Sequence, residues 1–537
     1  MHPSRETTLH DSTQSSRTAR NSLLIMVCTL LSRLLGIVKA RVIGSVFGAT
    51  GVADVINFTF NIPNNFRKLF AEGTVNAALI PAFSSLLGRN EKQRSFHLFA
   101  LLCTFQSILL IPLVVVSYCY GEPLIAFLSD FDADQIRLGG QLLPFFMVYL
   151  ATISLASIFN GVLQAHQNFL HAYLSPLFFS LCVIFGVWFL SERFQAMSMA
   201  YSVLAGGLLQ GSYSYLMVRR YGYRFKPTLR TRNAPFKEVF GAWALVSLGM
   251  GMQIVTQMVS FLFASHLSEG SVTAFSNSTI FYQTPYGIFF NAIAAVSLPL
   301  MSRASAAHDV PALRTYTRNA LLSLLALLLP SSILLFFLSR ESVSVVLQTG
   351  NYTLEDAHLT ALVLRPYLVF MVFSAWYALL LRLGYSANRH ALMTRIVFLQ
   401  NLLDIVLMWI FLKLGLDIVS LPLANGISYT IGVCVLLFLL RDLYPLTKDA
   451  QLFKGLFTII LANVPILAFC VFYHNLGLTW HERGSNLANL AYLVLIGVAA
   501  LCILLLSYKA ARIPLFSLLR TKKKGGDLQG DNLINLD

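Results

Sequence analysis

Charge is scarce in this chain. Only 12% of its 537 residues are Asp, Glu, Lys or Arg, whereas 56% are hydrophobic and the mean hydropathy is +0.68. Average soluble domains carry about 25% charged residues. The composition therefore excludes an ordinary water-soluble protein and predicts that lipid surrounds most of the chain.

The motifs of several functional classes are also missing. The seven cysteines have no paired spacing, the eleven histidines form no HExxH or similar pattern, and no glycine-rich nucleotide loop occurs. No nucleophile or pair of carboxylates stands out as a catalytic constellation. We therefore expect neither an enzyme nor a metal or disulfide framework, and no ATP-driven transport by this chain alone.

Long apolar runs are abundant, and each is long enough to cross a bilayer as a helix of about 20 residues. Helices are expected because backbone polar groups in lipid must be satisfied within their own segment. The expected fold class is an all-α polytopic membrane protein with about fourteen transmembrane helices. We place them at residues 21–46, 52–86, 96–119, 138–163, 172–190, 197–218, 239–265, 272–301, 319–338, 358–382, 391–412, 419–440, 455–474 and 488–508.

Basic residues predict the orientation, because Lys and Arg accumulate on the cytoplasmic side of membrane proteins. With the N-terminus inside, 28 of them fall in cytoplasmic segments and five in outer segments. Seven of the 28 lie at residues 219–237, between spans six and seven. The prediction is a multi-pass protein of the cytoplasmic (inner) membrane with both termini in the cytoplasm. Topology thus accounts for most of the net charge of +15, and nucleic-acid binding is not expected.

An internal repeat is indicated by prolines. Pro63 and Pro285 are 222 residues apart, as are Pro144 and Pro366. The flanking residues also align, although a chance match of prolines is the alternative. A duplicated six-helix unit would give two parallel lobes. The expected divisions are a tail (1–20), an N-lobe (21–220, spans one to six), a C-lobe (221–440, spans seven to twelve), two additional helices (441–510) and a second tail (511–537).

Charges inside the spans are the sharpest signal, since each central charge costs about 2.5–3.5 kcal/mol on insertion scales. Five basic and two acidic residues lie in the first two spans: Arg33, Lys39, Arg41, Asp54, Arg67, Lys68 and Glu72. Lys68 and Glu72 have the spacing of a helical ion pair. The surplus cations predict an anion-accepting cavity bordered by Arg33, Lys39 and Arg67. The alternative is that the long basic side chains reach the membrane interfaces, which we prefer for Arg41.

Helix geometry adds two expectations. Arg33 and Lys39 are about 120° apart around a straight helix, so both reach one cavity only if the helix bends, for which Gly36 offers a point, or faces it broadly. Pro63 is expected to break the helical hydrogen-bond ladder of span two.

The motifs of the first two spans resemble those of a known family, the MurJ (MviN) lipid II flippases of the multidrug/oligosaccharidyl-lipid/polysaccharide exporter superfamily. The matching residues are Ser32-Arg33-Leu-Leu-Gly36, Phe47-Gly48-Ala49 with Asp54, and Ile62-Pro63-Asn64 followed by Arg67-Lys68-Leu-Phe70-Ala71-Glu72-Gly73.

The resemblance implies a function. Such proteins move lipid-linked peptidoglycan precursor from the inner to the outer leaflet by alternating access, with a cationic cavity between two lobes and a groove for the polyprenyl tail at the last two helices. The implied partners are a polyprenyl-diphosphate-linked saccharide–peptide, membrane lipids and the cell-wall synthesis machinery. The substrate-binding residues expected here are Arg33, Lys39, Asp54, Arg67, Glu72 and Arg365.

A coupling ion is also implied by the resemblance. Some family members bind sodium through an acidic residue of span eleven, a part that Asp404 could play with Gln400 one turn before it. One alternative is coupling to the membrane potential. Another is that Asp404 serves only as a hydrogen-bonding partner of neighbouring helices.

The chain departs from the family pattern in both lobes. Lys39 and Ala40 stand where the family usually has Arg and Asp, and Thr279-Ile280 stands where it usually has an Asp-Arg pair. Arg365 could replace the missing cation of the C-lobe, or it could only anchor its helix at the interface. Because of this loss, an exporter of another lipid-linked saccharide or amphiphile and a non-transporting homologue remain alternatives. The basic cavity disfavours export of cationic drugs.

Overall fold

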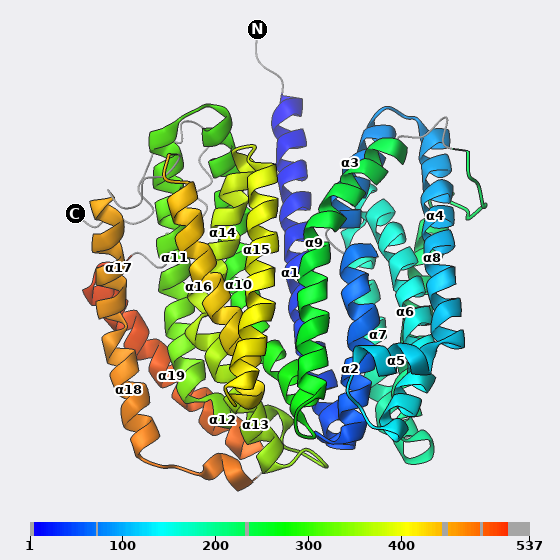
Figure 1. Cartoon of the computed structure of the whole chain (residues 1–537). Coiled ribbons are helices and arrows are strands. Elements are labelled where there is room, and N and C mark those ends of the chain that lie inside the picture. Colours follow the sequence, from blue (N-terminus) through cyan, green and yellow to red (C-terminus); the bar gives the residue numbers. More distant parts are fainter. Residues whose placement is uncertain (1–4, 71–73, 231–235, 443–448, 484–486, 514–537) are drawn as a thin grey trace. The chain divides into compact units, whose positions relative to one another are not determined.

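The computed structural model describes residues 5–70, 74–230, 236–442, 449–483 and 487–513 (Figure 1). All regular elements in these ranges are helices, so the all-α fold class is confirmed. The chain forms two compact units, Met1–Glu269 and Gly270–Asp537.

Unit 1 contains nine helices among its described residues. They are α1 (Arg5–Phe47), α2 (Gly51–Phe70), α3 (Thr74–Gly88), α4 (Lys92–Cys119), α5 (Gly121–Leu128), α6 (Ala133–Ala165), α7 (Phe169–Phe194), α8 (Met197–Arg219) and α9 (Phe236–Ser265). The long α6 is the centre of the unit, since it packs against α2, α3, α4, α7 and α8. It begins with a capping box in which Asp132 and Gln135 satisfy each other's backbone N–H groups.

Unit 2 contains the remaining described helices. They are α10 (Ser271–Ala306), α11 (Val310–Phe337), α12 (Ser339–Leu347), α13 (Leu354–Val369), α14 (Met371–Ser386), α15 (His390–Lys413), η1 (Asp417–Val419), α16 (Ser420–Leu439), α17 (Ala450–Ala462), α18 (Val464–Asn475), η3 (Trp480–Arg483) and α19 (Leu487–Ala510). Helices α10, α11, α13, α14 and α16 pack on one another, and α17 to α19 attach through α11 and α12.

Each of the fourteen expected spans coincides with helix. Within the described residues, nine helices are long and apolar enough to cross a membrane, and the pair α13–α14, bent by 48°, makes a tenth. The other four spans correspond to α1, α2 with α3, α8 and α9. The short helices α5 and α12 were not expected. They follow α4 and α11, at places that the predicted repeat makes equivalent.

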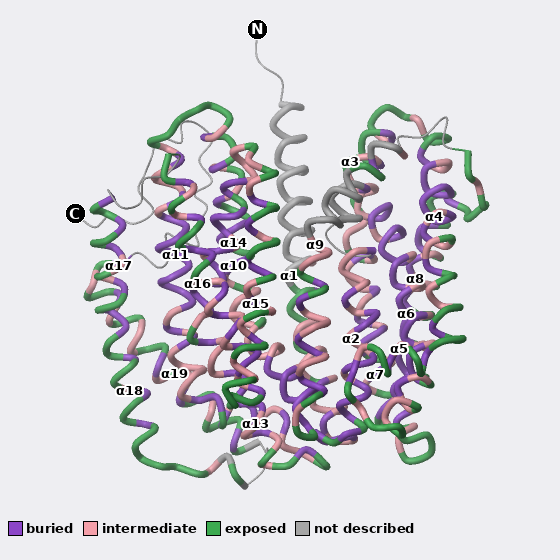
Figure 2. The backbone as a smooth tube through the Cα atoms, viewed as in Figure 1, coloured by how far each residue is buried: buried purple, intermediate pink, exposed green. Residues whose placement is uncertain are grey.

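The outward faces of the helices carry large apolar side chains. On α7, Phe185, Trp188 and Phe189 are 56%, 59% and 72% exposed, whereas the residues facing α6 and α8 are buried (Figure 2). In water such a surface would be strongly unfavourable. It is the pattern of a helix that packs on protein with one face and on lipid with the other.

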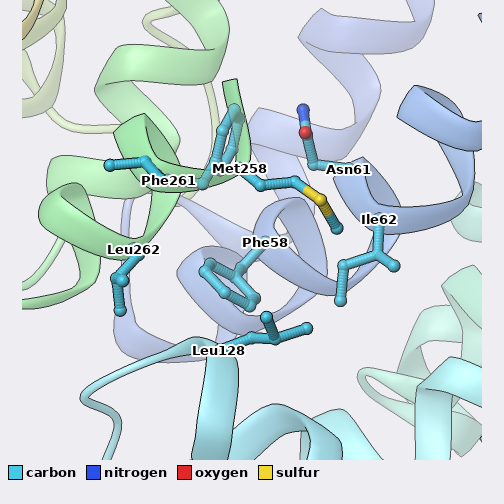
Figure 3. Close-up of a pocket in the computed structure, with 8 residues that line it drawn as sticks. Phe58, Asn61, Ile62, Leu128, Met258, Phe261 and Leu262 are labelled. Atoms are coloured by element: carbon cyan, nitrogen blue, oxygen red, sulfur yellow. The ribbon is translucent and has the colours of Figure 1, made fainter. Parts of the chain in front are cut away.

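The boundary between the units differs from the repeat-based division at residue 220. Helix α9, expected in the C-lobe, packs against α2 and α3 in unit 1. Figure 3 shows Met258 extending from α9 toward Phe58 and Ile62 of α2, around a small pocket of about 80 Å³. Phe261 of α9 also meets Phe58 edge-on, with ring centroids 6.4 Å apart. These contacts join α9 to α2 within unit 1.

The expected helix breaks are mostly absent. Helix α2 continues through Pro63, and α1 continues through Gly36, so neither residue ends its helix. A proline removes one ladder hydrogen bond, but the packing of the neighbouring turns can hold the rest of a membrane helix together. A break does occur after Pro366, where α13 ends at Val369 and α14 begins at Met371.

Candidate functional site

Two cations of unit 1, Lys39 on α1 and Arg67 on α2, are near enough for their charges to interact. The Lys39 Nζ lies 5.2 Å from the centre of the Phe179 ring, and the charge of Arg67 acts on Lys39. The Nε of Arg67 donates to Asn64 Oδ1 over 3.1 Å, which fixes the guanidinium on α2. Arg33 is half-buried on α1, one to two turns before Lys39. Two like charges within interaction range of each other favour an anion near both of them.

Lys68 is held by a polar row that was missed in the sequence. Its Nζ donates to Asn65 Oδ1 over 3.0 Å and to Gln257 Oε1 of α9 over 2.5 Å, and Asn65 donates in turn to Asn61. The asparagines at positions 57, 61 and 65, spaced by one helical turn, were the available signal. Glu72, the expected partner of Lys68, lies outside the described residues, so that ion pair and its predicted substrate role stay predictions.

Two acidic residues, Asp54 and Glu269, lie at or near the start of α2 and interact with the helix itself. Asp54 is 4% exposed in the first turn, where a carboxylate is favoured by the helix dipole. At the same end, Glu269 Oε1 accepts a hydrogen bond of 2.5 Å from the backbone N–H of Gly51. The binding of substrate by Asp54 stays a prediction.

Arg365 is attached to neighbouring helices of unit 2. Its Nε donates to Ser339 Oγ of α12 over 3.0 Å, and its guanidinium carbon lies 5.6 Å from the centre of the Phe336 ring of α11. Both contacts tie α13 to its neighbours, as the anchoring alternative requires. A direct role of Arg365 in substrate binding stays a prediction.

Another cation of unit 2 lies against an aromatic row. The guanidinium carbon of Arg382 on α14 is 4.7 Å from the centre of the Phe290 ring. On α10, Tyr282, Tyr286 and Phe290 stack with centroid distances of 5.5 and 5.2 Å. Ile280 lies on the same helix. The one-turn spacing of the three aromatic residues could have indicated the row from the sequence.

Asp404 forms a buried polar centre with α16. It is 1% exposed, and its Oδ2 accepts a hydrogen bond of 2.7 Å from Asn425 Nδ2. Its Oδ1 has no hydrogen-bond partner among the described residues. Gln400, one turn earlier, donates to Ser428 Oγ over 3.0 Å. A buried carboxylate oxygen without a donor is costly unless a cation or proton reaches it.

The donors around Asp404 fit a monovalent cation better than a divalent one. The described residues contain no group of three or more His, Cys, Asp or Glu side chains that could hold a metal ion. A calcium site normally draws on several carboxylate oxygens. One carboxylate with neutral amide and hydroxyl neighbours supplies a single negative charge, which matches one positive charge.

The additional helices of unit 2 border an open apolar groove of about 530 Å³. Its wall includes Phe457, Leu461 and Pro465 from α17 and α18, and Leu506 and Ala510 from α19. Helix α19 is fixed there by Tyr508, which is fully buried. Its hydroxyl donates to the carbonyl oxygen of Ala326 on α11 over 2.8 Å and accepts from Asn463 Nδ2 over 2.9 Å.

Comparisons with known proteins agree on one family. The model of the family described as "Lipid II flippase MurJ" matches residues 43–480. A probable lipid II flippase MurJ from Borreliella burgdorferi is 29% identical, over 92% of this chain and 96% of its own length. A probable lipid II flippase MurJ from Thermotoga maritima is 26% identical, over 89% of this chain and 94% of its own length.

Solved structures show the same fold. A lipid II flippase MurJ in an inward closed conformation superposes with a TM-score of 0.75 at 23% identity, covering 91% of this chain and 99% of that one. A multidrug resistance transporter of the MATE family, in the MOP superfamily, superposes with a TM-score of 0.66 at 14% identity, covering 79% and 99%. The helical membrane fold of this chain is thus similar to the folds of both transporters.

Proposed function

The chain belongs to the MurJ family of lipid II flippases, and on that premise we propose that it translocates lipid II, the lipid-linked peptidoglycan precursor, from the inner to the outer leaflet of the cytoplasmic membrane. The family consists of transporters, and the proposal is therefore of a transporter and not of an enzyme. Alternating access is the proposed mode of transport.

The observation that carries the proposal is the arrangement of Lys39 and Arg67. Charged side chains within membrane helices are costly, and an anionic diphosphate would interact favourably with both of these cations. The guanidinium of Arg67 offers parallel N–H donors that match two phosphate oxygens, whereas Lys39 acts as a point charge. Arg33, on the same helix as Lys39, extends the positive surface toward the expected cytoplasmic end.

The groove along α17 to α19 suits the polyprenyl chain of such a substrate. Its lining is mostly aliphatic and aromatic, and it is open along one side. An apolar chain that stays in such a groove is not exposed to water while the headgroup crosses the membrane. We propose that the prenyl tail rests there.

The orientation and the coupling ion are part of the proposal. The distribution of basic residues supports cytoplasmic termini, and the peptidoglycan substrate would bring the protein near the cell-wall synthesis machinery.

The Oδ1 of Asp404, which has no hydrogen-bond partner among the described residues, supports coupling to sodium, with the membrane potential as the alternative. Sodium chloride, compared with choline chloride, should raise the melting temperature of the wild type and leave that of Asp404→Asn unchanged.

Replacement of a known flippase tests the function. Cells depleted of their own lipid II flippase should grow with normal shape when they express this chain. Lysis despite normal insertion of the protein would contradict the proposal. In that case the absence of a basic residue at Ile280 would favour the second candidate, the export of another lipid-linked saccharide.

A further inference from the structure

The segment from Arg219 to Arg230, which follows α8, concentrates positive charge on an exposed surface. It has no acidic residue, and the nearest ones in the sequence are Glu192 and Glu238. Five basic side chains of the segment are exposed: Arg219, Arg220, Arg224, Lys226 and Arg230. We call this segment the basic loop.

The basic loop is held by a tyrosine buried in unit 1. Tyr223 is fully buried, shares a hydrogen bond of 2.6 Å with Ser95 and another of 3.2 Å with His166 Nε2. Its ring meets those of Phe96 and Phe99 edge-on, at centroid distances of 4.7 and 5.3 Å. Burial raises the pKa of Tyr223, so its hydroxyl remains neutral at physiological pH.

The rest of the basic loop is fixed through its backbone. The N–H of Thr228 donates to Thr104 Oγ1 over 3.1 Å, and the carbonyl oxygen of Arg230 lies 2.5 Å from His97 Nε2. Both partners are on α4. Because they are seven residues apart, the tip of the loop at Thr228 lies roughly 10 Å further along α4 than Arg230 does, at 1.5 Å per residue. The loop therefore descends beside the membrane-spanning part of α4 and returns (Figure 1).

The tip and its flanks carry exposed apolar side chains. Leu229 is 68% exposed, Phe225 41% and Tyr221 37%, and Figure 2 shows this loop largely exposed beside α4. Aromatic and aliphatic side chains alternating with Lys and Arg are suited to the boundary between lipid headgroups and acyl chains. To contact the tip of the loop, a water-soluble partner would have to reach past the helix ends and along the membrane-spanning part of α4.

Other connections that the topology places in the cytoplasm hold their basic residues differently. Arg94 pairs with Glu91 at 2.9 Å, and Arg318 pairs with Asp449 at 3.3 Å. Arg389 pairs with Asp442. In the part of the chain that the structure describes, no carboxylate forms an ion pair with the basic loop. Topology alone explains the number of its charges, but not a fixed backbone that presents them away from the carboxylates that the structure describes.

We propose that the basic loop is a binding site for anionic phospholipid headgroups of the surrounding bilayer. The guanidinium groups of Arg219, Arg220, Arg224 and Arg230, with the Lys226 ammonium, bind phosphate oxygens, and Leu229 inserts among the acyl chains. This site is separate from the proposed substrate site on α1 and α2, and its failure would leave the proposed function untouched.

The test is lipid selection by the purified protein in nanodiscs with equal amounts of phosphatidylglycerol and phosphatidylcholine. After extraction in mild detergent, native mass spectrometry counts each lipid that remains bound. The wild type should retain phosphatidylglycerol in excess. Replacing all five basic residues by Gln should lower that excess about tenfold, since each basic residue near an anionic surface contributes to binding. Replacing the four arginines by Lys should lower it much less.

A matched control replaces five basic residues of other connections, Arg89, Lys92, Arg94, Arg441 and Lys454, by Gln. Its excess of phosphatidylglycerol should equal that of the wild type. Leu229→Asp, a single change at an exposed position, should also lower the excess, and it provides the test if the five-fold variant fails to insert. An excess that is unchanged in the loop variants, or that falls equally in the control, would overturn the proposal. Binding of soluble polyglutamate by the loop, without lipid selection, would assign it to an acidic protein instead.

Discussion

Arg67 is the residue on which headgroup binding most depends in this account. Its charge acts on Lys39, and its Nε is oriented by Asn64. We expect Arg67→Ala to abolish complementation of flippase-depleted cells, and Arg67→Lys to retain less activity than the wild type, because a point charge replaces a fork that matches phosphate.

The matched control for Arg67 is Arg94→Ala. Arg94 is an exposed arginine of α4 whose only described ion pair is with Glu91, so its loss should leave complementation intact. Full complementation by Arg67→Ala, at a normal level of inserted protein, would remove the main support for anion binding by unit 1.

The missing cation of unit 2 has two candidate replacements, and their contacts differ. Arg365 is bound to Ser339 and Phe336, whereas Arg382 lies on the aromatic row of α10, the helix that carries Ile280. If substrate binding needs a cation from unit 2, Arg382→Ala should lower the rate of lipid II translocation about tenfold, the worth of one charge-assisted hydrogen bond. Ile280→Arg should partly restore that rate.

Arg365→Ala separates a binding role from anchoring. An anchoring role predicts a lower melting temperature with a translocation rate near that of the wild type. A large loss of rate in Arg365→Ala, with no effect of Arg382→Ala, would assign the cation to Arg365. Wild-type rates in both variants would leave the cations of unit 1 to hold the headgroup alone.

Among the helices, Tyr508 connects α19 to α11 and to the joint between α17 and α18, which no sequence pattern predicts. Its hydroxyl bonds both the carbonyl oxygen of Ala326 on α11 and the side chain of Asn463, at the joint between α17 and α18. Tyr508→Phe leaves that carbonyl without its donor in a buried place, which costs about 1–3 kcal/mol. We expect a lower melting temperature of the purified protein.

Tyr492→Phe is the control for Tyr508, because Tyr492 lies on the same helix and is 55% exposed. Its melting temperature should match that of the wild type. Equal melting temperatures for all three proteins would show that the hydroxyl of Tyr508 does not hold α19 in place.

The elements also show what a sequence can and cannot predict. Apolar length predicted the helices, because a span must satisfy its own backbone in lipid. It did not predict that α2 continues through Pro63, or that α9 joins unit 1, since both depend on packing against helices distant in the sequence. The candidate site residues also divide into those that residue type indicates and those that only side-chain contacts reveal. Residue type indicated Arg67 and Asp404, but the polar row that holds Lys68 and the aromatic row beneath Arg382 emerge only from side-chain contacts.

For the whole molecule, the predicted topology can be checked by labelling single cysteines. In a background without the seven native cysteines, Phe127→Cys on α5 should react with an impermeant reagent added outside, because this residue is 82% exposed in the predicted outer connection. Lys226→Cys, at an exposed position of the predicted cytoplasmic connection, should react only after the membrane is opened. Labelling of both positions from the same side would contradict the fourteen-helix topology.

Transport itself is the central claim, and it can be measured with the purified chain in vesicles that contain fluorescent lipid II. The account predicts that headgroups cross the bilayer faster than in protein-free vesicles, and that Arg67→Ala, inserted at the same density, brings the rate back to that of protein-free vesicles. A wild-type rate equal to that of protein-free vesicles, with the protein folded and sodium and membrane potential supplied, would contradict it.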